Sequence, residues 1–234
     1  MNVYSILAHP NRQSLNGSLF DHANNYFSSL GYNVDTIHLQ EHFQQLVESN
    51  LATSDENKIP AEYKTYRSSM SVNYNQGVAI STEFAKEQIA KLKAADILFI
   101  QTPIMVWSLP AILKFYIEMV FVPCQLFLMY LPEDDTNFHI TKLMLGKKVF
   151  FSFTLGCSQG VTNSVTGSAD NLVHPSKSTF EFVGYEWLSP HITWGTMTTS
   201  EKLSKKDEYF ASFNDTLINT FAAPTSVDAG ILDA

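Results

Sequence analysis

Short apolar runs alternate with longer stretches of mixed polarity along this chain of 234 residues. The runs are rich in β-branched and aromatic side chains, which is typical of buried strands. Runs of this kind occupy residues 2–8, 32–39, 97–100, 149–154 and 187–194. Between them, apolar residues recur at a spacing near that of an α-helix, which predicts helices at 15–30, 82–95, 109–122, 176–184 and 200–221.

This alternation of strands and helices indicates an α/β protein. A helix between two strands lets the chain cross over the sheet, so the strands are expected to run parallel, with helices on both faces. We therefore predict a doubly wound parallel five-stranded sheet in the order 2-1-3-4-5. The loops 9–18, 102–108 and 154–162 would then converge at one edge of that sheet.

One polar segment interrupts the alternation. Residues 41–80 contain too few aliphatic side chains to bury a core of their own, so we interpret them as an excursion with one or two short helices. The chain is then a single domain over 1–221. The small and polar residues 222–234 are expected to form a flexible tail.

The second of the converging loops has an unusual composition. The apolar strand breaks at Thr102-Pro103, and residues 104–107 that follow are all apolar. Ser108 is a suitable N-cap, with Pro110 in the first helical turn. Ligands of open α/β sheets bind beyond the carboxyl ends of strands, and flat apolar side chains there suit a ring system. The alternative is that Trp107 belongs to the core.

Composition narrows the classes of function. The net charge is −8 and no basic stripe is present, which disfavours nucleic-acid binding. Cys124 and Cys157 form neither a disulfide framework nor a metal-binding spacing, so no metal is expected. No apolar run is long enough to insert into a membrane, and no secretory signal is visible. We expect a soluble cytoplasmic protein.

The first and third loops offer hydrogen-bond donors. The first lacks the glycine patterns of dinucleotide and Walker loops, but a helix N-terminus after it could bind phosphate. Ser14, Asn16 and Ser18 would add neutral donors, and His9 and Arg12 charge. The alternative is that Ser14 only caps the helix. In the third loop, the backbone amides beside the glycines could approach a planar ligand and stabilise negative charge on it; these are the amides of Gly156, Cys157 and Gly160.

Three motifs carry a resemblance to a known family. AHPNRQSLNGSLFDHA, AADILFIQTPIMVWSLPAILKFYIEMVF and FFSFTLG, in this order, resemble the flavodoxin-like NAD(P)H:quinone oxidoreductases of the DT-diaphorase type. The resemblance implies a homodimer that holds FAD or FMN. It also implies transfer of a hydride from NAD(P)H to the flavin, and then of two electrons to a quinone-like acceptor. The chain length favours FAD, with FMN as the alternative.

The resemblance also implies roles for individual residues. The phosphate side of the flavin would contact His9, Ser14, Leu15 and Asn16. The ring would be lined by Pro103, Ile104, Met105, Val106 and Trp107. Its polar rim would contact Thr154, Leu155, Gly156 and Cys157. The segment with which a partner subunit roofs the substrate pocket would be Leu126, Phe127 and Leu128.

The chain departs from the family at the catalytic positions. Thr162 and Ser168 stand where the family has a Tyr and a His, and neither can carry a positive charge or act as an acid near neutral pH. The catalytic group is expected to comprise Gly156, Cys157, Thr162 and Ser168, with His174 as a possible substitute for the missing histidine. Cys157 is either a redox thiol or a small residue where glycine is usual. These departures leave open a regulatory flavin- or nucleotide-binding subunit, of the kind that accompanies potassium-efflux systems, and a one-electron flavodoxin shuttle.

Overall fold

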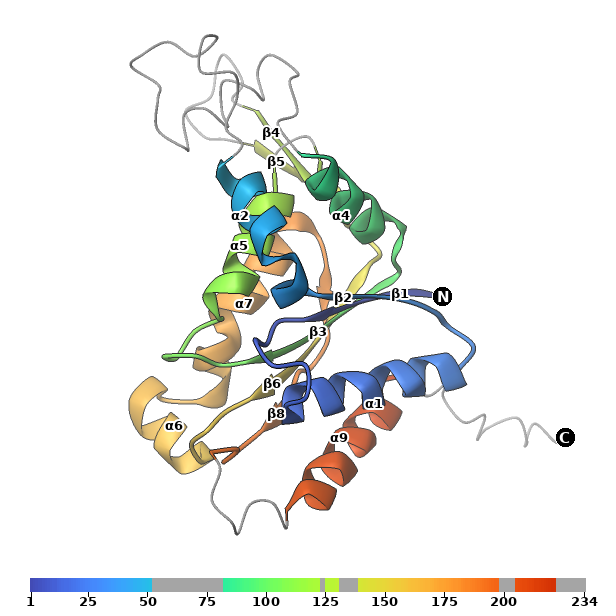
Figure 1. Ribbon diagram of the computed structural model, residues 1–234. Coiled ribbons are helices and arrows are strands. Elements are labelled where there is room, and N and C mark those ends of the chain that lie inside the picture. Colours follow the sequence, from blue (N-terminus) through green and yellow to red (C-terminus); the bar gives the residue numbers. More distant parts are fainter. Residues whose placement is uncertain (52–81, 123–124, 131–138, 198–204, 222–234) are drawn as a thin grey trace, which may run out of the picture.

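The computed structural model describes residues 1–51, 82–122, 125–130, 139–197 and 205–221 (Figure 1). Its main sheet contains β1 (Asn2–Leu7), β2 (Asn33–His38), β3 (Ile97–Pro103), β6 (Lys148–Thr154), β7 (Glu186–Trp187) and β8 (His191–Thr193). The order is β2-β1-β3-β6-β7, β8 also pairs with β6, and all of these pairs are parallel. The expected α/β fold with a parallel sheet is confirmed.

The sheet has six strands in place of the expected five, and its order along the labelled elements is β2-β1-β3-β6-β7. The predicted strand 187–194 is divided into β7 and β8, which pair with the two ends of β6. Pro190 lies between them and has no N–H group to donate to the ladder, which explains the division. A separate antiparallel hairpin of β4 (Phe127–Tyr130) and β5 (His139–Lys142) was not predicted.

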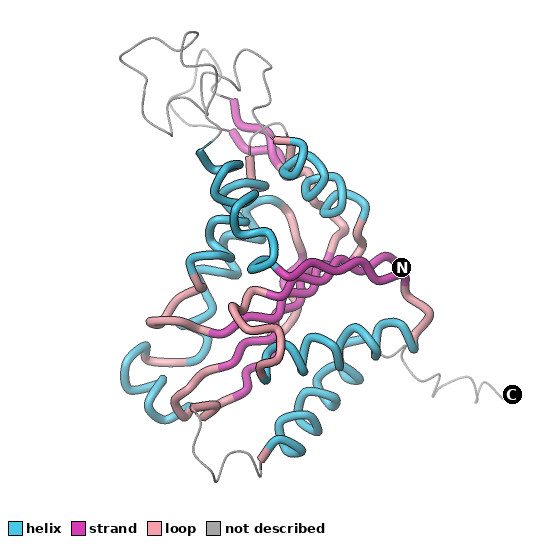
Figure 2. Tube along the Cα trace, in the orientation of Figure 1, coloured by secondary structure: helices cyan, strands magenta, loops and turns pink. Residues whose placement is uncertain are grey.

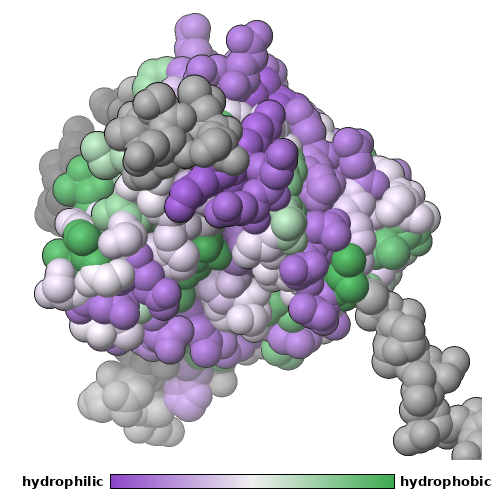
Figure 3. All heavy atoms as spheres, turned by 90° about the horizontal axis from the view of Figure 1, so that it is seen from below, coloured by the Kyte–Doolittle hydropathy of each residue, from purple (hydrophilic) through white to green (hydrophobic). Residues whose placement is uncertain are grey.

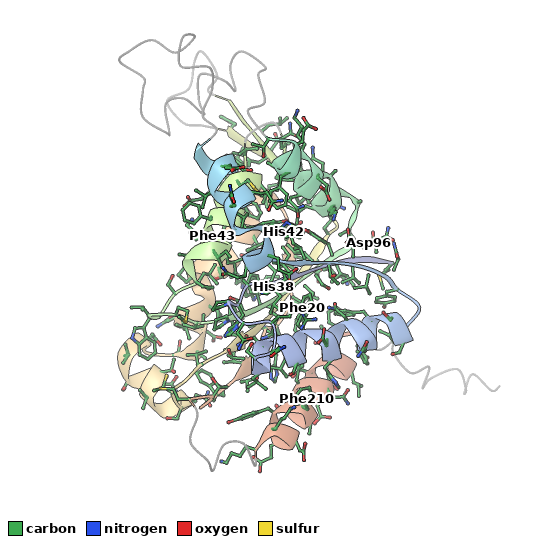
Figure 4. The ribbon with its side chains drawn as sticks, in the orientation of Figure 1. Phe20, His38, His42, Phe43, Asp96 and Phe210 are labelled. Atoms are coloured by element: carbon green, nitrogen blue, oxygen red, sulfur yellow. The ribbon has the colours of Figure 1, made fainter. Side chains whose placement is uncertain are left out.

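Helices cover both faces of the sheet (Figure 2). On one face lie α1 (Leu15–Ser29) and α9 (Lys206–Phe221), and Figure 4 labels Phe20 of the first and Phe210 of the second. The other face carries α2 (Phe43–Leu51), α4 (Glu83–Ala94), α5 (Ala111–Val120) and α7 (Ala169–Val183). Each face has its own apolar core, and all seven residues of β3 are buried between the two. Burial on both faces is typical of the central strand of a parallel sheet.

Two helices begin at other residues than predicted, and one helix was not predicted. The N-cap of α5 is Pro110, because Ser108 is instead hydrogen-bonded to Met105 in a tight turn. The unpredicted helix α6 (Gln159–Thr166) precedes α7, and α7 begins seven residues before the predicted start at 176. The prediction failed there because Pro175, which normally ends a helix, lies inside α7.

Several expectations fall partly outside the described residues. The part of the excursion 41–80 that is described holds the end of η1 (Leu39–His42) and α2, and 52–80 lies outside. The first residues of the predicted helix 200–221 and the tail 222–234 also lie outside. Among the described helices, none combines the length and the apolar character needed to cross a membrane.

His191 joins β8 to α9 inside the protein. Only 5% of the residue is exposed, and its ring nitrogens lie 3.0 Å from the hydroxyl oxygens of Thr216 and Thr193. The Thr216 hydroxyl donates to the carbonyl of Ser212, so it accepts from Nδ1–H of His191. Burial lowers the pKa of His191 to about 4, and the ring is therefore neutral at pH 7.

Acid is therefore expected to destabilise the fold through His191. In the unfolded chain the same ring binds a proton below a pH of about 6.5. The unfolded state thus gains protons first as the pH falls, and the free energy of unfolding should drop by about 2 kcal/mol between pH 7.5 and pH 5. Urea unfolding at the two pH values measures this drop. In His191→Gln the drop in the free energy of unfolding should be smaller than in the wild type by that amount. The exposed His174→Gln is the control, and an unchanged drop in His191→Gln would contradict the assignment.

Candidate functional site

The loop from β1 to α1 is built around the first turn of the helix. Ser14 caps α1, and its hydroxyl accepts from the Gly17 amide at 3.3 Å. The Ser18 amide donates to the Ser14 carbonyl, which leaves the amides of Leu15 and Asn16 with no partner among the described residues. Free amides at a helix N-terminus favour an anion. Ser14 is therefore a cap, and the turn that it caps retains free donors.

Arg12 does not supply charge to this turn. Its guanidinium is paired with Asp21 and also donates to the Gly17 carbonyl at 3.1 Å. A side chain at Gly17 would collide with the Arg12 backbone, since an added Cβ would lie 1.8 Å from the Arg12 carbonyl oxygen. Gly17 thus permits the loop to fold tightly over α1, with Arg12 directed to Asp21.

His9 faces the same turn as a neutral ring. Its Nδ1 lies 3.0 Å from the Asn11 amide nitrogen and 2.9 Å from the Asn11 carbonyl oxygen. It can therefore accept from the amide when the proton is on Nε2, or donate to the carbonyl when the proton is on Nδ1. The Ser14 hydroxyl also lies 3.0 Å from Nδ1. Burial, more than any other cause, lowers the pKa of His9. In the tautomer protonated at Nε2, His9 can offer a hydrogen-bond donor without a full positive charge.

His38, which sequence reasoning missed, supports this loop from β2. Its Nε2 donates to the His9 carbonyl at 2.7 Å, and its Nδ1 lies 3.1 Å from Glu41 Oε1. The hydrogen bond with His38 lowers the pKa of Glu41. Figure 4 shows His38 at the end of β2, close to His42 of η1.

A buried polar network connects the three segments. The Asn16 amide group donates to Thr154 Oγ1 at 2.9 Å, and Gln101 Nε2 donates to Asn16 Oδ1 at 2.9 Å. All three side chains are at most 5% exposed. They come from α1, β3 and β6, so the network fixes the start of α1 against the carboxyl ends of both strands. Gln101 was also missed, although a polar residue directly after ILFI was a visible signal.

The loop after β3 is a strained and exposed turn. Met105 and Ser108 exchange two backbone hydrogen bonds, of 2.8 and 3.0 Å, and close it. Val106 and Trp107 at its tip have positive φ angles of 49° and 62°. This conformation is unfavourable for non-glycine residues and most of all for a β-branched one. Even so, Met105, Val106 and Trp107 are 52, 94 and 39% exposed. The alternative that Trp107 belongs to the core is therefore not the observed one, and its role in lining a ring stays a prediction.

The loop after β6 presents two further amides. The Leu155 amide donates to the Thr193 carbonyl at 2.9 Å, whereas those of Gly156 and Cys157 have no partner among the described residues. The Ile104 amide donates to the Thr154 carbonyl at 2.9 Å, so this loop starts beside the apolar turn. Free amides in fixed positions can stabilise negative charge on a ligand.

Thr162 and Ser168, which stand at the family's Tyr and His positions, make hydrogen bonds that stabilise helices. Thr162 is fully buried, and its hydroxyl donates to the Ser158 carbonyl at 3.2 Å and lies 3.4 Å from Cys157 Sγ. Ser168 caps α7 by accepting from the Asn171 amide at 3.1 Å. Both hydroxyls therefore have structural partners, and their catalytic role stays a prediction. His174, the suggested substitute, is bonded to Ser178 on α7 at 3.3 Å.

The segment predicted to cover the substrate pocket, residues 126–128, lies away from the three converging loops. Leu126 and Phe127 are buried and Leu128 is 36% exposed. The ring of Phe127 packs edge-on against Phe182 of α7. Figure 1 shows the β4–β5 hairpin at the opposite end of the molecule from α6. Within one chain, these residues therefore do not join the three converging loops.

The described residues fit a flavin better than a metal ion. They contain no cluster of His, Cys, Asp or Glu side chains that could bind a metal. They do bring free amides, an exposed apolar turn and a second pair of free amides to one edge of the sheet. Figure 3 shows hydrophobic residues at the left of the molecule, the side where α6 lies in Figure 1, and also at the right.

Two quinone dehydrogenases are similar to this chain in sequence. Human ribosyldihydronicotinamide dehydrogenase [quinone] is 26% identical over 208 residues, which cover 87% of this chain and 85% of that protein. Rat NAD(P)H dehydrogenase [quinone] 1 is 28% identical over 193 residues, 81% of this chain and 67% of that protein.

Solved structures show the same fold. A putative quinone reductase from Klebsiella pneumoniae has a TM-score of 0.71 at 23% identity, covering 94% of this chain and 86% of its own. An FMN-dependent NADH-azoreductase from Bacillus anthracis, in complex with FMN, has a TM-score of 0.60 at 17% identity, covering 93 and 98%. The family described as having a flavodoxin-like fold matches residues 1–217 of the sequence, and the chain belongs to that family.

Proposed function

We propose that this protein is a flavin-dependent oxidoreductase that transfers reducing equivalents from NAD(P)H to a quinone-like acceptor. The observation that carries the proposal is the convergence of two pairs of free amides and an exposed apolar turn at one edge of the sheet. These groups complement a phosphate, a flat ring and the polar rim of that ring. The quinone dehydrogenases of similar sequence support the activity.

The first turn of α1 is proposed to hold the phosphate. The amides of Leu15 and Asn16 would donate to it, and His9 would be a third donor in the tautomer that carries its proton on Nε2. Because Arg12 is paired with Asp21, neutral donors and the helix dipole supply most of the attraction. The ordered loop, supported by His38, would place these donors before the ligand arrives.

The remaining residues are proposed to orient the ring. Pro103, Ile104 and the exposed turn would cover one side of it, and Trp107 would supply the largest apolar surface. The amides of Gly156 and Cys157 would face its polar rim. The bound flavin supplies the redox chemistry between NAD(P)H and quinone, while these residues orient it and exclude water.

The finer identities are part of the proposal. FAD is proposed from the chain length, and the FMN complex of the azoreductase makes FMN the alternative. A cytoplasmic homodimer is proposed, in which Leu126, Phe127 and Leu128 of one chain would cover the site of the other. This arrangement would explain why these residues lie away from the three loops of their own chain.

One observation favours a second candidate, a flavin-binding regulatory subunit with little turnover. Thr162 and Ser168 have helix-stabilising partners and cannot carry charge. A regulatory subunit would bind flavin but would oxidise NADPH no faster with a simple benzoquinone than without it. Rapid quinone-dependent oxidation of NADPH would exclude this candidate.

The purified protein is expected to be yellow or to become so with added flavin. The converging amides and apolar turn should retain one flavin per chain. An absorption spectrum, followed by mass identification of the flavin released on denaturation, measures both its presence and its identity. A colourless protein that binds neither FAD nor FMN would disprove the proposed function.

Replacing Trp107 by alanine is expected to weaken flavin binding about tenfold or more. The change removes apolar surface worth roughly 1.5–3 kcal/mol when a large side chain is fully covered. Flavin titration followed by fluorescence measures the dissociation constant. Leu145→Ala is the control, because Leu145 is 71% exposed and lies before β6, at the other edge of the sheet. Equal affinities in the two variants would show that the turn does not contact the flavin.

Replacing Val106 by glycine is expected to stabilise the protein while weakening flavin binding. Glycine adopts positive φ without strain, so the free energy of unfolding should rise by about 1 kcal/mol. The gain would identify strain that the native turn retains for its ligand. Urea unfolding and flavin titration measure the two effects. A destabilised variant would mean that the Val106 side chain, although 94% exposed, supports the fold.

A further inference from the structure

Residues 194–197, which we call the strap, run alongside the loop after β6. The amides of Gly195, Thr196 and Met197 donate to the carbonyls of Cys157, Leu155 and Gly156 at 2.8, 2.8 and 3.3 Å. The Thr196 hydroxyl donates to the Leu155 carbonyl as well, at 3.0 Å. Three successive carbonyls of the loop are thus bonded to the strap.

These bonds determine where the free amides of the loop point. The Leu155 carbonyl and the Gly156 N–H belong to one planar trans peptide, in which the two groups point in opposite directions. Fixing the carbonyl toward the strap therefore directs the Gly156 N–H away from it. The same reasoning links the Gly156 carbonyl, held by Met197, to the Cys157 N–H.

The strap is itself held in place. The Tyr209 hydroxyl of α9 donates to the Gly195 carbonyl at 3.3 Å, and Gly195 has a positive φ of 70°. The Met197 side chain lies directly on Gly156, where an added Cβ would approach Met197 Cγ to 2.6 Å. The loop and the strap therefore pack closely, and a displacement of one would move the other.

The surroundings of the loop increase the importance of these amides. Residues 155–169 and 193–197 contain no Lys, Arg or His. The side chains at the family's Tyr and His positions, Thr162 and Ser168, are uncharged. Within these two segments, negative charge on a ligand would be stabilised by uncharged donors, among them the free backbone amides of Gly156 and Cys157.

We propose that Thr196 is a positioning residue that aims the Gly156 amide at the rim of the flavin and thereby favours the reduced, more negatively charged flavin over the oxidised one. This inference rests on the proposed function, because it requires a flavin at that edge of the sheet. Thr196 contacts the Leu155 carbonyl through both its amide and its hydroxyl. Losing the hydroxyl bond would loosen the peptide that carries the Gly156 N–H.

The test compares Thr196→Val, which lacks the hydroxyl, with Thr196→Ser, which retains it. In the flavin-loaded protein, a redox titration measures the two-electron midpoint potential, and a flavin titration measures the affinity for the oxidised form. We expect Thr196→Val to reduce the preference for reduced flavin about tenfold, which lowers the potential by about 30 mV. Thr196→Ser should match the wild type. Thr179→Val is the control, since it removes a threonine hydroxyl bond of 2.8 Å to the Pro175 carbonyl on α7.

The outcomes distinguish a failure of the inference about Thr196 from a failure of the proposed function. A flavin-loaded Thr196→Val protein with the wild-type potential overturns the inference alone, and so does a Thr196→Ser protein with the potential of Thr196→Val. A wild-type protein that binds no flavin overturns the proposed function together with the inference. If Thr196→Val does not fold, Tyr209→Phe tests the same strap through Gly195, and its potential should fall by a smaller amount. An unchanged potential in Tyr209→Phe would then overturn the inference.

Discussion

The hydrogen bonds among Asn16, Gln101 and Thr154 hold together the three elements from which the candidate site is built. Buried polar groups are costly unless they bond to one another, so these three side chains constrain α1, β3 and β6 to a single relative position. The free amides of α1 belong to Leu15 and to Asn16 itself, and the apolar turn and the loop after β6 start just beyond the ends of the two strands. The site is thus positioned by the interior of the sheet, although its donors and its apolar surface belong to loops.

Much of this architecture could be predicted because its signals are local. The apolar run 97–100 identifies a central strand, and the spacing of Leu15, Leu19, Ala23 and Phe27 identifies the buried side of α1. The convergence of three loops follows from the parallel sheet alone. The motif with Pro103 and residues 104–107 also identified the exposed apolar turn. Its strain was not predictable, since nothing in the residue types Val106 and Trp107 indicates positive φ.

What escaped prediction depends on contacts between distant residues. Neither the bond from His38 to the His9 carbonyl nor the pairing of the strap with the loop after β6 has a pattern in the sequence. Helix α7 continues through Pro175 because its apolar side packs on the sheet and outweighs the local cost of the proline. The opposite holds for β7 and β8. There, at the edge of the sheet, the local effect prevails, because the missing N–H of Pro190 interrupts the strand.

The uncharged loop after β6 changes how a bound flavin would be controlled. A tyrosine and histidine pair acts through proton transfer and titrates, so its effect varies with pH near neutrality. Fixed peptide dipoles carry no titrating proton, and their effect depends only on distance and direction. The redox properties of a bound flavin would therefore depend on the geometry of two backbone segments, the loop after β6 and the strap. They would not depend on the identity of two side chains. In this chain, the redox properties of a bound flavin would then depend on residues such as Thr196 of the strap, which acts through the Leu155 carbonyl.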